Sequence, residues 1–139
     1  MKKGQISFPN RLEELSNFRN AIEEFIGESI ELRTKSRIIL SLDEIVSNII
    51  EHGFPNGGES QIKILLEQSE SEIKFVVEDE GVEFNPLQKK PVDVDEHLEL
   101  GEDGGMGIYI VQKIMKMDYE RSSNKNRLYL RKALKEKEE

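Results

Sequence analysis

The chain has 139 residues, the length of one ordinary domain, with 20 basic and 28 acidic residues and a formal net charge of −8. This charge argues against non-specific binding to nucleic acid or anionic membranes, and the absence of cysteine excludes disulfides, thiolate metal sites and cysteine nucleophiles. No apolar run is long enough to span a membrane, and the start, MKKGQISFPN, lacks the apolar region of a signal peptide. We therefore expect a cytoplasmic protein with one domain over residues 1–134 and a charged tail over residues 135–139.

The first two thirds of the chain predict one strand, two helices and a hairpin. A short strand is expected at Gln5–Phe8, followed by helices at Arg11–Ile26 and Arg33–Glu51, whose apolar residues recur every three or four positions. The runs Gln61–Glu67 and Glu72–Asp79 flank a polar turn and indicate two antiparallel strands.

The remaining third predicts a long loop, a helix and a second hairpin. Residues 82–104 show no periodicity and are longer than an ordinary connection, so we expect a lid. Residues 91–103 contain six acidic and no basic residues, which favours a solvated segment. Their spacing is not that of a calcium-binding EF-hand loop. A helix is expected from Met106 to Met115, with Met117 as a candidate last residue, then strands at Asp118–Arg121 and Leu128–Leu134 around a turn at Ser122–Asn126. Helices grouped against such strands predict an α+β fold, a two-layer sandwich with a mostly antiparallel mixed sheet and helices on one face.

Three polar residues form a stripe on the second helix. Glu44, Asn48 and His52 are spaced four residues apart, so at about 100° per residue they lie on the shoulder of the apolar face. An amide oxygen such as that of Asn48 suits Mg²⁺, and a carboxylate one turn away could orient or deprotonate a nucleophile. The alternative is a solvated i, i+4 pair, with His52 favoured by the helix dipole.

A carboxylate ends the strand Glu72–Asp79 on its apolar side. Asp79 shares parity with three apolar residues, Ile73, Phe75 and Val77, so we expect it to face the core. There it could accept a hydrogen bond from an exocyclic amine such as that of adenine, and Gly81 would let the backbone approach the base closely. The alternative is a turn that closes the strand, since Asp and Gly are common turn residues.

A glycine-rich segment, GEDGGMG at residues 101–107, leads directly into the last helix. Glycines at this place allow the free N–H groups of a helix N-terminus to meet phosphate oxygens. The sequence contains no GxxxxGK[ST], so a phosphate site here is not a Walker P-loop.

Taken in order, the segments DEIVSNIIEHG, VEDEGVEFNPL and GGMGIYIV resemble the GHKL (Bergerat-fold) ATP-binding family, with its histidine-kinase-like ATPase fold. Within that family they look most like the small anti-sigma-factor serine/threonine kinases of the RsbW and SpoIIAB type. The resemblance covers nearly the whole chain.

The resemblance implies a role for each motif residue. Asn48 would ligate Mg²⁺ at the ATP phosphates, Glu44 would be the candidate catalytic base or water-orienting residue, and Asp79 would bind the adenine amine. The other residues implied to bind the nucleotide are His52, Gly81, Gly104, Gly105, Met106, Gly107 and Ile108, of which Gly105 and Gly107 would hinge the lid. One departure is Glu83, which stands where many relatives have the second glycine of D-x-G-x-G; another is the last hairpin, SSNKNR, which lacks their Gly-Gly-Thr-like turn.

The resemblance further implies a kinase that uses ATP and Mg²⁺ and transfers the γ-phosphoryl group to a Ser or Thr of an anti-sigma-factor antagonist of the STAS type. A sigma factor as a second partner and homodimerisation are implied in the same way, whereas direct contact with nucleic acid or membrane is not. The alternative is a non-enzymatic switch, in which ATP controls partner binding without phosphoryl transfer. The presence of Glu44 favours the kinase, since binding alone requires no base. A purely structural interaction domain fits least, because Asn48, Asp79 and Gly107 are present as well.

Overall fold

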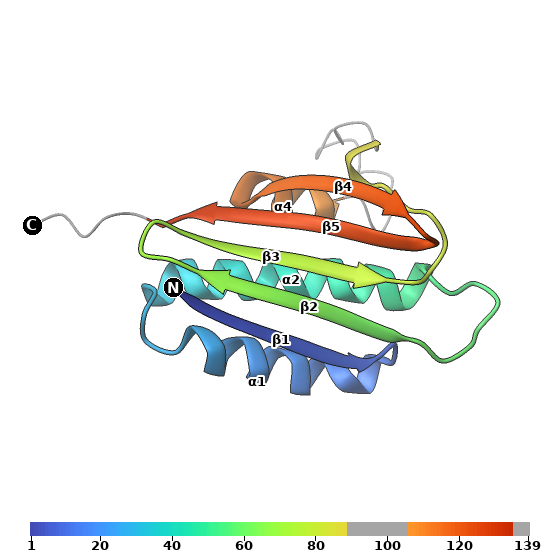
Figure 1. Cartoon of the computed structure of the whole chain (residues 1–139), viewed down its shortest axis with the longest axis horizontal. Helices are drawn as coiled ribbons and strands as arrows, with labels where there is room; N and C mark the ends of the chain where they lie inside the picture. The colour runs from blue at the N-terminus through green and yellow to red at the C-terminus, as the bar shows by residue number, and fades with distance from the viewer. Residues whose placement is uncertain (89–105, 135–139) are drawn as a thin grey trace, which may run out of the picture.

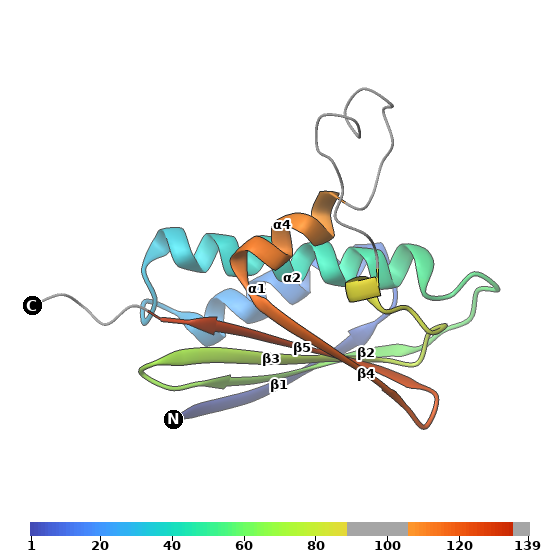
Figure 2. The ribbon, with the colours of Figure 1, turned by 90° about the horizontal axis from the view of Figure 1, so that it is seen from above.

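A computed structural model describes residues 1–88 and 106–134. Five strands form one sheet in the order β1-β2-β3-β5-β4, and the α-helices of the described ranges lie on one face of it (Figures 1 and 2). The strands are β1 (Lys2–Pro9), β2 (Gln61–Gln68), β3 (Glu72–Asp79), β4 (Lys116–Ser122) and β5 (Lys125–Ala133). The helices are α1 (Leu15–Ile26), α2 (Leu32–His52) and α4 (Met106–Ile114), with short 3-10 helices η1 (Leu12–Glu14) and η2 (Pro86–Gln88).

The predicted α+β sandwich is confirmed, and Figure 2 shows its two layers, with the sheet below and the helices above. All four pairings between the described strands are antiparallel. The sheet was expected to be mixed, but the described strands include no parallel pair. The chain passes from β3 through α4 to the edge strand β4, and β5 then returns between β3 and β4.

The core lies between the helices and the inner face of the sheet. Alternate residues of each central strand point into it, as Ile73, Phe75 and Val77 do from β3. From the opposite layer, α2 contributes a buried stripe that includes Leu42 and Val46. Truncating such a buried leucine to alanine typically costs about 2–5 kcal/mol, so this packing holds α2 firmly against the sheet.

Several predicted boundaries change, among them the start of β1, which lies at Lys2 and not at Gln5. The first helix does not begin at Arg11, which has extended backbone angles; residues 12–14 form η1 instead, and α1 starts at Leu15. Met117 lies in β4 and not in the last helix, since α4 ends at Ile114.

The final hairpin turn is shorter than predicted. Only Ser123 and Asn124 form it, both with positive φ, as the tightest hairpin turns require. Asn126 therefore belongs to β5, where it pairs with Arg121 of β4 and Asp79 of β3.

Part of the predicted lid at residues 82–104 is described, and it includes η2. Its remainder and the predicted tail at residues 135–139 lie outside the described residues. Over the two described ranges, no helix combines the length and the apolar character that crossing a membrane demands.

Candidate functional site

The C-terminal ends of α2 and β3 border a cavity of about 30 Å³ between the helix layer and the sheet. At this size the cavity holds one or two water molecules. Its walls are mostly apolar, with a few polar side chains among them, the usual composition of a small-molecule site. The lining residues are Ile45, Asn48, Ile49, His52, Gly53, Asp79, Val82, Phe84, Pro86, Ile108, Tyr119, Asn126 and Leu128.

Asp79 lies at the inner end of β3 and faces the cavity, which confirms the face predicted from strand parity. Its side chain is only 4% exposed. The backbone N–H of Gly81 donates to Asp79 Oδ1 over 2.8 Å, and Asn126 Nδ2 donates to the same oxygen over 3.0 Å. Within the described residues both hydrogen bonds thus end on Oδ1, which leaves Oδ2 as the acceptor for a donor in the cavity.

Burial raises the pKa of the Asp79 carboxyl above its ordinary value, and the hydrogen bonds from Asn126 and the Gly81 N–H offset part of this effect. A buried carboxylate next to an apolar wall gains a partner when an amine donor binds, so the site favours a ligand with such a donor.

Gly81 does allow a close backbone contact, but the contact is with the backbone at the end of α2 and not with a bound base. A Cβ at this position would lie 2.6 Å from the carbonyl oxygen of Gly53, at the end of α2. The next residue, Val82, donates its N–H to that same oxygen over 2.8 Å. Gly81 therefore allows the loop after β3 to pack on the C-terminus of α2, which brings Asp79 and His52 to one cavity.

The three residues of the polar stripe of α2 do not all line the cavity. Asn48 and His52 line the cavity, whereas Glu44 lies one turn further toward the N-terminus of the helix. Asn48 Nδ2 donates to Glu44 Oε1 over 3.4 Å. This orientation of the amide leaves Asn48 Oδ1 available to accept or to ligate a cation.

Glu44 rests on the first turn of α4, at Gly107. A Cβ at residue 107 would overlap the Glu44 carboxylate, so any other amino acid there would displace that side chain. Gly107 thereby brings together a carboxylate of α2 and the beginning of α4, two elements far apart in the sequence. The free N–H groups of a helix start lie at this end of α4.

Only some of the other residues predicted at the glycine-rich segment lie within the described part of the chain. Ile108 is buried and lines the cavity, and Met106 begins α4. Gly104 and Gly105 lie outside the described residues.

The floor of the cavity also includes two residues that the sequence patterns did not predict as part of a site, Asn126 and Tyr119. Asn126 is 5% exposed; its Nδ2 donates to Asp79 and, over 2.8 Å, to the carbonyl of Val82. Its Oδ1 accepts from the Tyr119 hydroxyl and, over 3.4 Å, from the Phe84 N–H. The signal for Asn126 was its alternation with the apolar Leu128, which places both on one face of a strand.

Comparison with known proteins decides which family this arrangement belongs to. Residues 8–132 match the family described as the histidine kinase-like ATPase domain. The chain belongs to this family. The resemblance predicted from the three motifs is confirmed, and membership of this ATPase family implies ATP binding.

Two relatives of this ATPase domain carry the name of a kinase. The serine/threonine-protein kinase BtrW of Bordetella bronchiseptica is 27% identical over 99 residues, which cover 70% of both chains. The serine-protein kinase RsbW of Staphylococcus aureus is 30% identical over 81 residues, which cover 55% of this chain and 51% of RsbW. The match therefore spans about half of RsbW, and the likeness fits an ATP-binding kinase of this general kind.

Solved structures agree with the fold of the ATPase domain. A structure of the RsbU and RsbW domains of Rv1364c from Mycobacterium tuberculosis matches 96% of this chain and 33% of that one, with a TM-score of 0.66 and 13% identity. The histidine kinase domain of the blue-light-activated kinase EL346 from Erythrobacter litoralis matches 88% of this chain and 60% of that one, with a TM-score of 0.56 and 18% identity. At these identities the likeness concerns the fold alone.

Proposed function

We propose that this protein is a Mg²⁺- and ATP-dependent serine/threonine protein kinase. The observation that carries the proposal is the seating of the Glu44 carboxylate against Gly107, at the start of α4, with Asn48 hydrogen-bonded to it. A module that only bound nucleotide would not need a carboxylate held at that place. The kinase names of BtrW and RsbW support the same activity.

In this proposal Asp79 binds the adenine, with Oδ2 accepting a hydrogen bond from the exocyclic amine. Burial and the fixed Oδ1 orient this oxygen before the nucleotide arrives, which favours binding. The cavity of about 30 Å³ is smaller than a purine, so Phe84 and Pro86, on the loop after β3, move aside to admit the base.

The donor set at Asn48 fits a magnesium ion. In the described part of the chain, no three His, Asp or Glu side chains converge on a common metal position. Mg²⁺ commonly uses one or two protein oxygens together with nucleotide phosphates and waters, and Asn48 Oδ1 supplies such an oxygen. When bound, the ion would neutralise phosphate charge. We propose that His52 and the start of α4, at Gly107 and Ile108, border the phosphates.

The phosphoryl step assigns one chemical task to Glu44. The hydroxyl oxygen of the acceptor Ser or Thr attacks the γ-phosphorus of ATP, the bond from that phosphorus to the β,γ-bridging oxygen breaks, and ADP leaves with its electrons. The proton of the hydroxyl passes to the Glu44 carboxylate, and Gly107 keeps that carboxylate in place.

As partners of this activity we propose an anti-sigma-factor antagonist of the STAS type as phosphoacceptor and a sigma factor that the protein restrains. We further propose a homodimer and a cytoplasmic location, which suit both partners. These assignments extend to this chain the family resemblance and the RsbW likeness.

Calorimetry of ATP binding, with and without Mg²⁺, tests the site first. We expect Mg²⁺-dependent binding by wild type and at least tenfold weaker binding by Asp79→Asn, because the amide cannot present the same charged acceptor. Transfer of label from γ-³²P-ATP to a STAS protein, compared between wild type and Glu44→Ala, then separates kinase from switch. ATP binding without any transfer by wild type favours the switch, and transfer retained by Glu44→Ala contradicts the assigned base.

A further inference from the structure

The peptide group between Gly81 and Val82, in the loop after β3, is hydrogen-bonded from both layers of the protein. Its carbonyl, on Gly81, accepts from Arg121 Nη1 over 2.8 Å and from Asn126 Nδ2 over 3.4 Å. Its N–H, on Val82, donates to the carbonyl of Gly53 over 2.8 Å. Because a peptide group is planar and rigid, the sheet and the end of α2 together fix its orientation.

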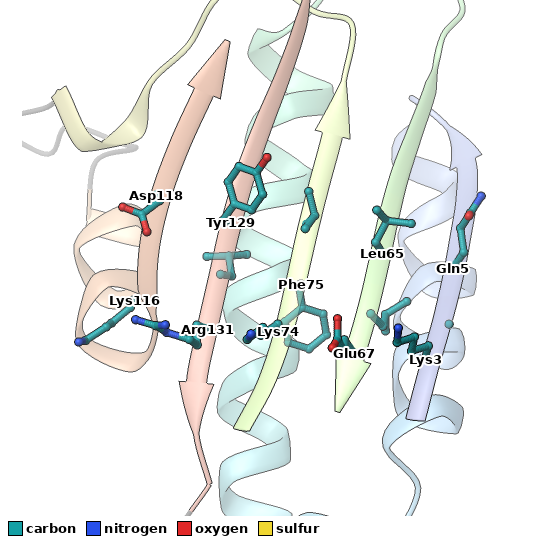
Figure 3. A pocket seen from close by; sticks show the side chains of 14 residues that line it. Lys3, Gln5, Leu65, Glu67, Lys74, Phe75, Lys116, Asp118, Tyr129 and Arg131 are labelled. Atoms are coloured by element: carbon teal, nitrogen blue, oxygen red, sulfur yellow. The ribbon is translucent and has the colours of Figure 1, made fainter. Parts of the chain in front are cut away.

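Arg121 reaches this peptide group from the edge strand of the sheet. Figure 3 shows Asp118 of β4 on the outer face of the sheet, the face away from the helices. Successive side chains of a strand alternate between the two faces, so Tyr119 and Arg121 point to the inner face, where Tyr119 lines the cavity. Strand register places Arg121 opposite Asn126 of β5, the residue whose amide also donates to Asp79.

The side chain of Arg121 is bonded to the loop and not to a carboxylate. Within residues 1–88 and 106–134, its one hydrogen bond is the bond to the Gly81 carbonyl, and it forms no ion pair. A hydrogen bond from a charged donor is stronger than one between neutral groups. Arg121 therefore contributes to the conformation of the loop, where a backbone carbonyl is its acceptor.

This contact extends to Asp79 through Gly81. The N–H of Gly81 donates to Asp79 Oδ1 over 2.8 Å, so a group that holds Gly81 also holds the donor to this oxygen. Arg121 acts on the same carboxylate by its charge. Burial raises the pKa of the Asp79 carboxyl, whereas the hydrogen bonds from Asn126 and the Gly81 N–H, together with the positive charge of Arg121, lower it.

We propose that Arg121 is a positioning residue for nucleotide binding, which holds Gly81 so that Asp79 keeps one oxygen directed into the cavity. The inference rests on the proposed role of Asp79 toward adenine. Arg121 is not among the residues that line the cavity, so it acts through Gly81 and Asp79 and not by contact with the nucleotide. An acceptor that is oriented before the ligand arrives costs less free energy on binding.

Calorimetry of ATP binding to the full chain in the presence of Mg²⁺ tests this role. Arg121→Met keeps the aliphatic stem but removes the charge and the donors, and we expect it to weaken ATP binding by about tenfold. Arg121→Lys keeps a charged donor and should remain within about threefold of wild type. The matched control is Arg11→Met, which removes an arginine paired with the exposed Glu59 over 3.0 Å and should change ATP affinity by less than about twofold.

The pKa of Asp79 in the nucleotide-free protein, followed by carboxyl ¹³C NMR, separates positioning from a general effect on stability. It should rise in Arg121→Met and stay near the wild-type value in Arg121→Lys, since lysine retains the charge. The other ionisable groups around this carboxyl are Glu78 on β3, His52 on α2 and Tyr119 on β4, which all the variants share. The described residues of α4 and β5 that line the cavity are uncharged.

Several outcomes would overturn the inference. These are wild-type ATP affinity in Arg121→Met, an equal loss of affinity in Arg11→Met, or an unchanged pKa of Asp79 in Arg121→Met. Circular dichroism shows whether each variant is folded, and Arg121→Gln takes the place of Arg121→Met if the latter is not. Absence of ATP binding by wild type would contradict the nucleotide site itself, and the pKa measurement, made without nucleotide, would then report separately whether Arg121 acts on Asp79.

Discussion

Replacement of Asn126 by alanine removes the side chain that connects the residues on the floor of the proposed nucleotide site. Its amide donates to Asp79 Oδ1 and the Val82 carbonyl, and accepts from the Tyr119 hydroxyl and the Phe84 N–H. Because Asn126 is 5% exposed, its loss leaves buried groups short of partners.

The expected cost follows from these contacts. A hydrogen bond to a charged group contributes about 1.5–3 kcal/mol, and a buried polar group left unpaired costs about 1–3 kcal/mol. Water that enters the vacated space recovers part of this, so we expect Asn126→Ala to lower the free energy of unfolding by about 2–4 kcal/mol. The pKa of Asp79 should rise further, since Asn126 is the side-chain hydrogen bond that lowers it.

Urea unfolding followed by circular dichroism at neutral pH measures the loss. Tyr119→Phe, which removes one hydroxyl from the same network, should cost about 0.5–1.5 kcal/mol. Asn17→Ala, an exposed asparagine of α1 with one side-chain hydrogen bond, to Glu14, serves as the control and should change stability by less than about 0.5 kcal/mol. A loss below about 0.5 kcal/mol for Asn126→Ala would refute the structural role inferred for this residue.

Three further predictions concern the site. The folded-state pKa of Asp79 lies above its ordinary value of 3.8, so the folded protein binds this proton more tightly, and the free energy of unfolding should rise as pH falls from the raised pKa toward 3.8. Asp79→Asn should lack this rise in unfolding curves measured across that window, and equal pH slopes in the two proteins contradict the assignment. Gly107→Ala should displace the flexible Glu44 side chain with little change in melting temperature, yet reduce the rate of phosphoryl transfer at least about tenfold. A wild-type rate of transfer by this variant would show that the position of the Glu44 carboxylate is unimportant. Asn48→Ala should abolish the Mg²⁺ dependence of ATP affinity in calorimetry, and an unaltered dependence removes Asn48 as a ligand.

Local patterns predicted much of this protein. The spacing of apolar residues located α2 to within a residue at each end, because a helix that packs on a sheet must bury one stripe of its surface. The two-residue period of β3 placed Asp79 on the core face for the same reason. The helices and strands therefore follow from short-range patterns of burial.

The final hairpin shows where local patterns fail. Asn and Ser are common in turns, so the sequence predicts a turn over all of residues 122–126. Only two residues form the turn, and the tight geometry returns Asn126 to the sheet beside Asp79. Propensity identified a turn, but its length was set by the pairing of β4 with β5.

Short-range patterns of the sequence are enough to predict the order of elements, the inward face of Asp79 and the polar stripe that includes Glu44 and Asn48. Two contacts emerge only in the folded chain: the hydrogen bond of Asn126 to the Asp79 carboxylate, and the contact of Glu44 with Gly107. Side-chain direction within a helix or strand repeats with a fixed short period, whereas these contacts depend on strand register and helix docking. A shift of one residue in any pairing would turn the aligned side chains to the opposite face.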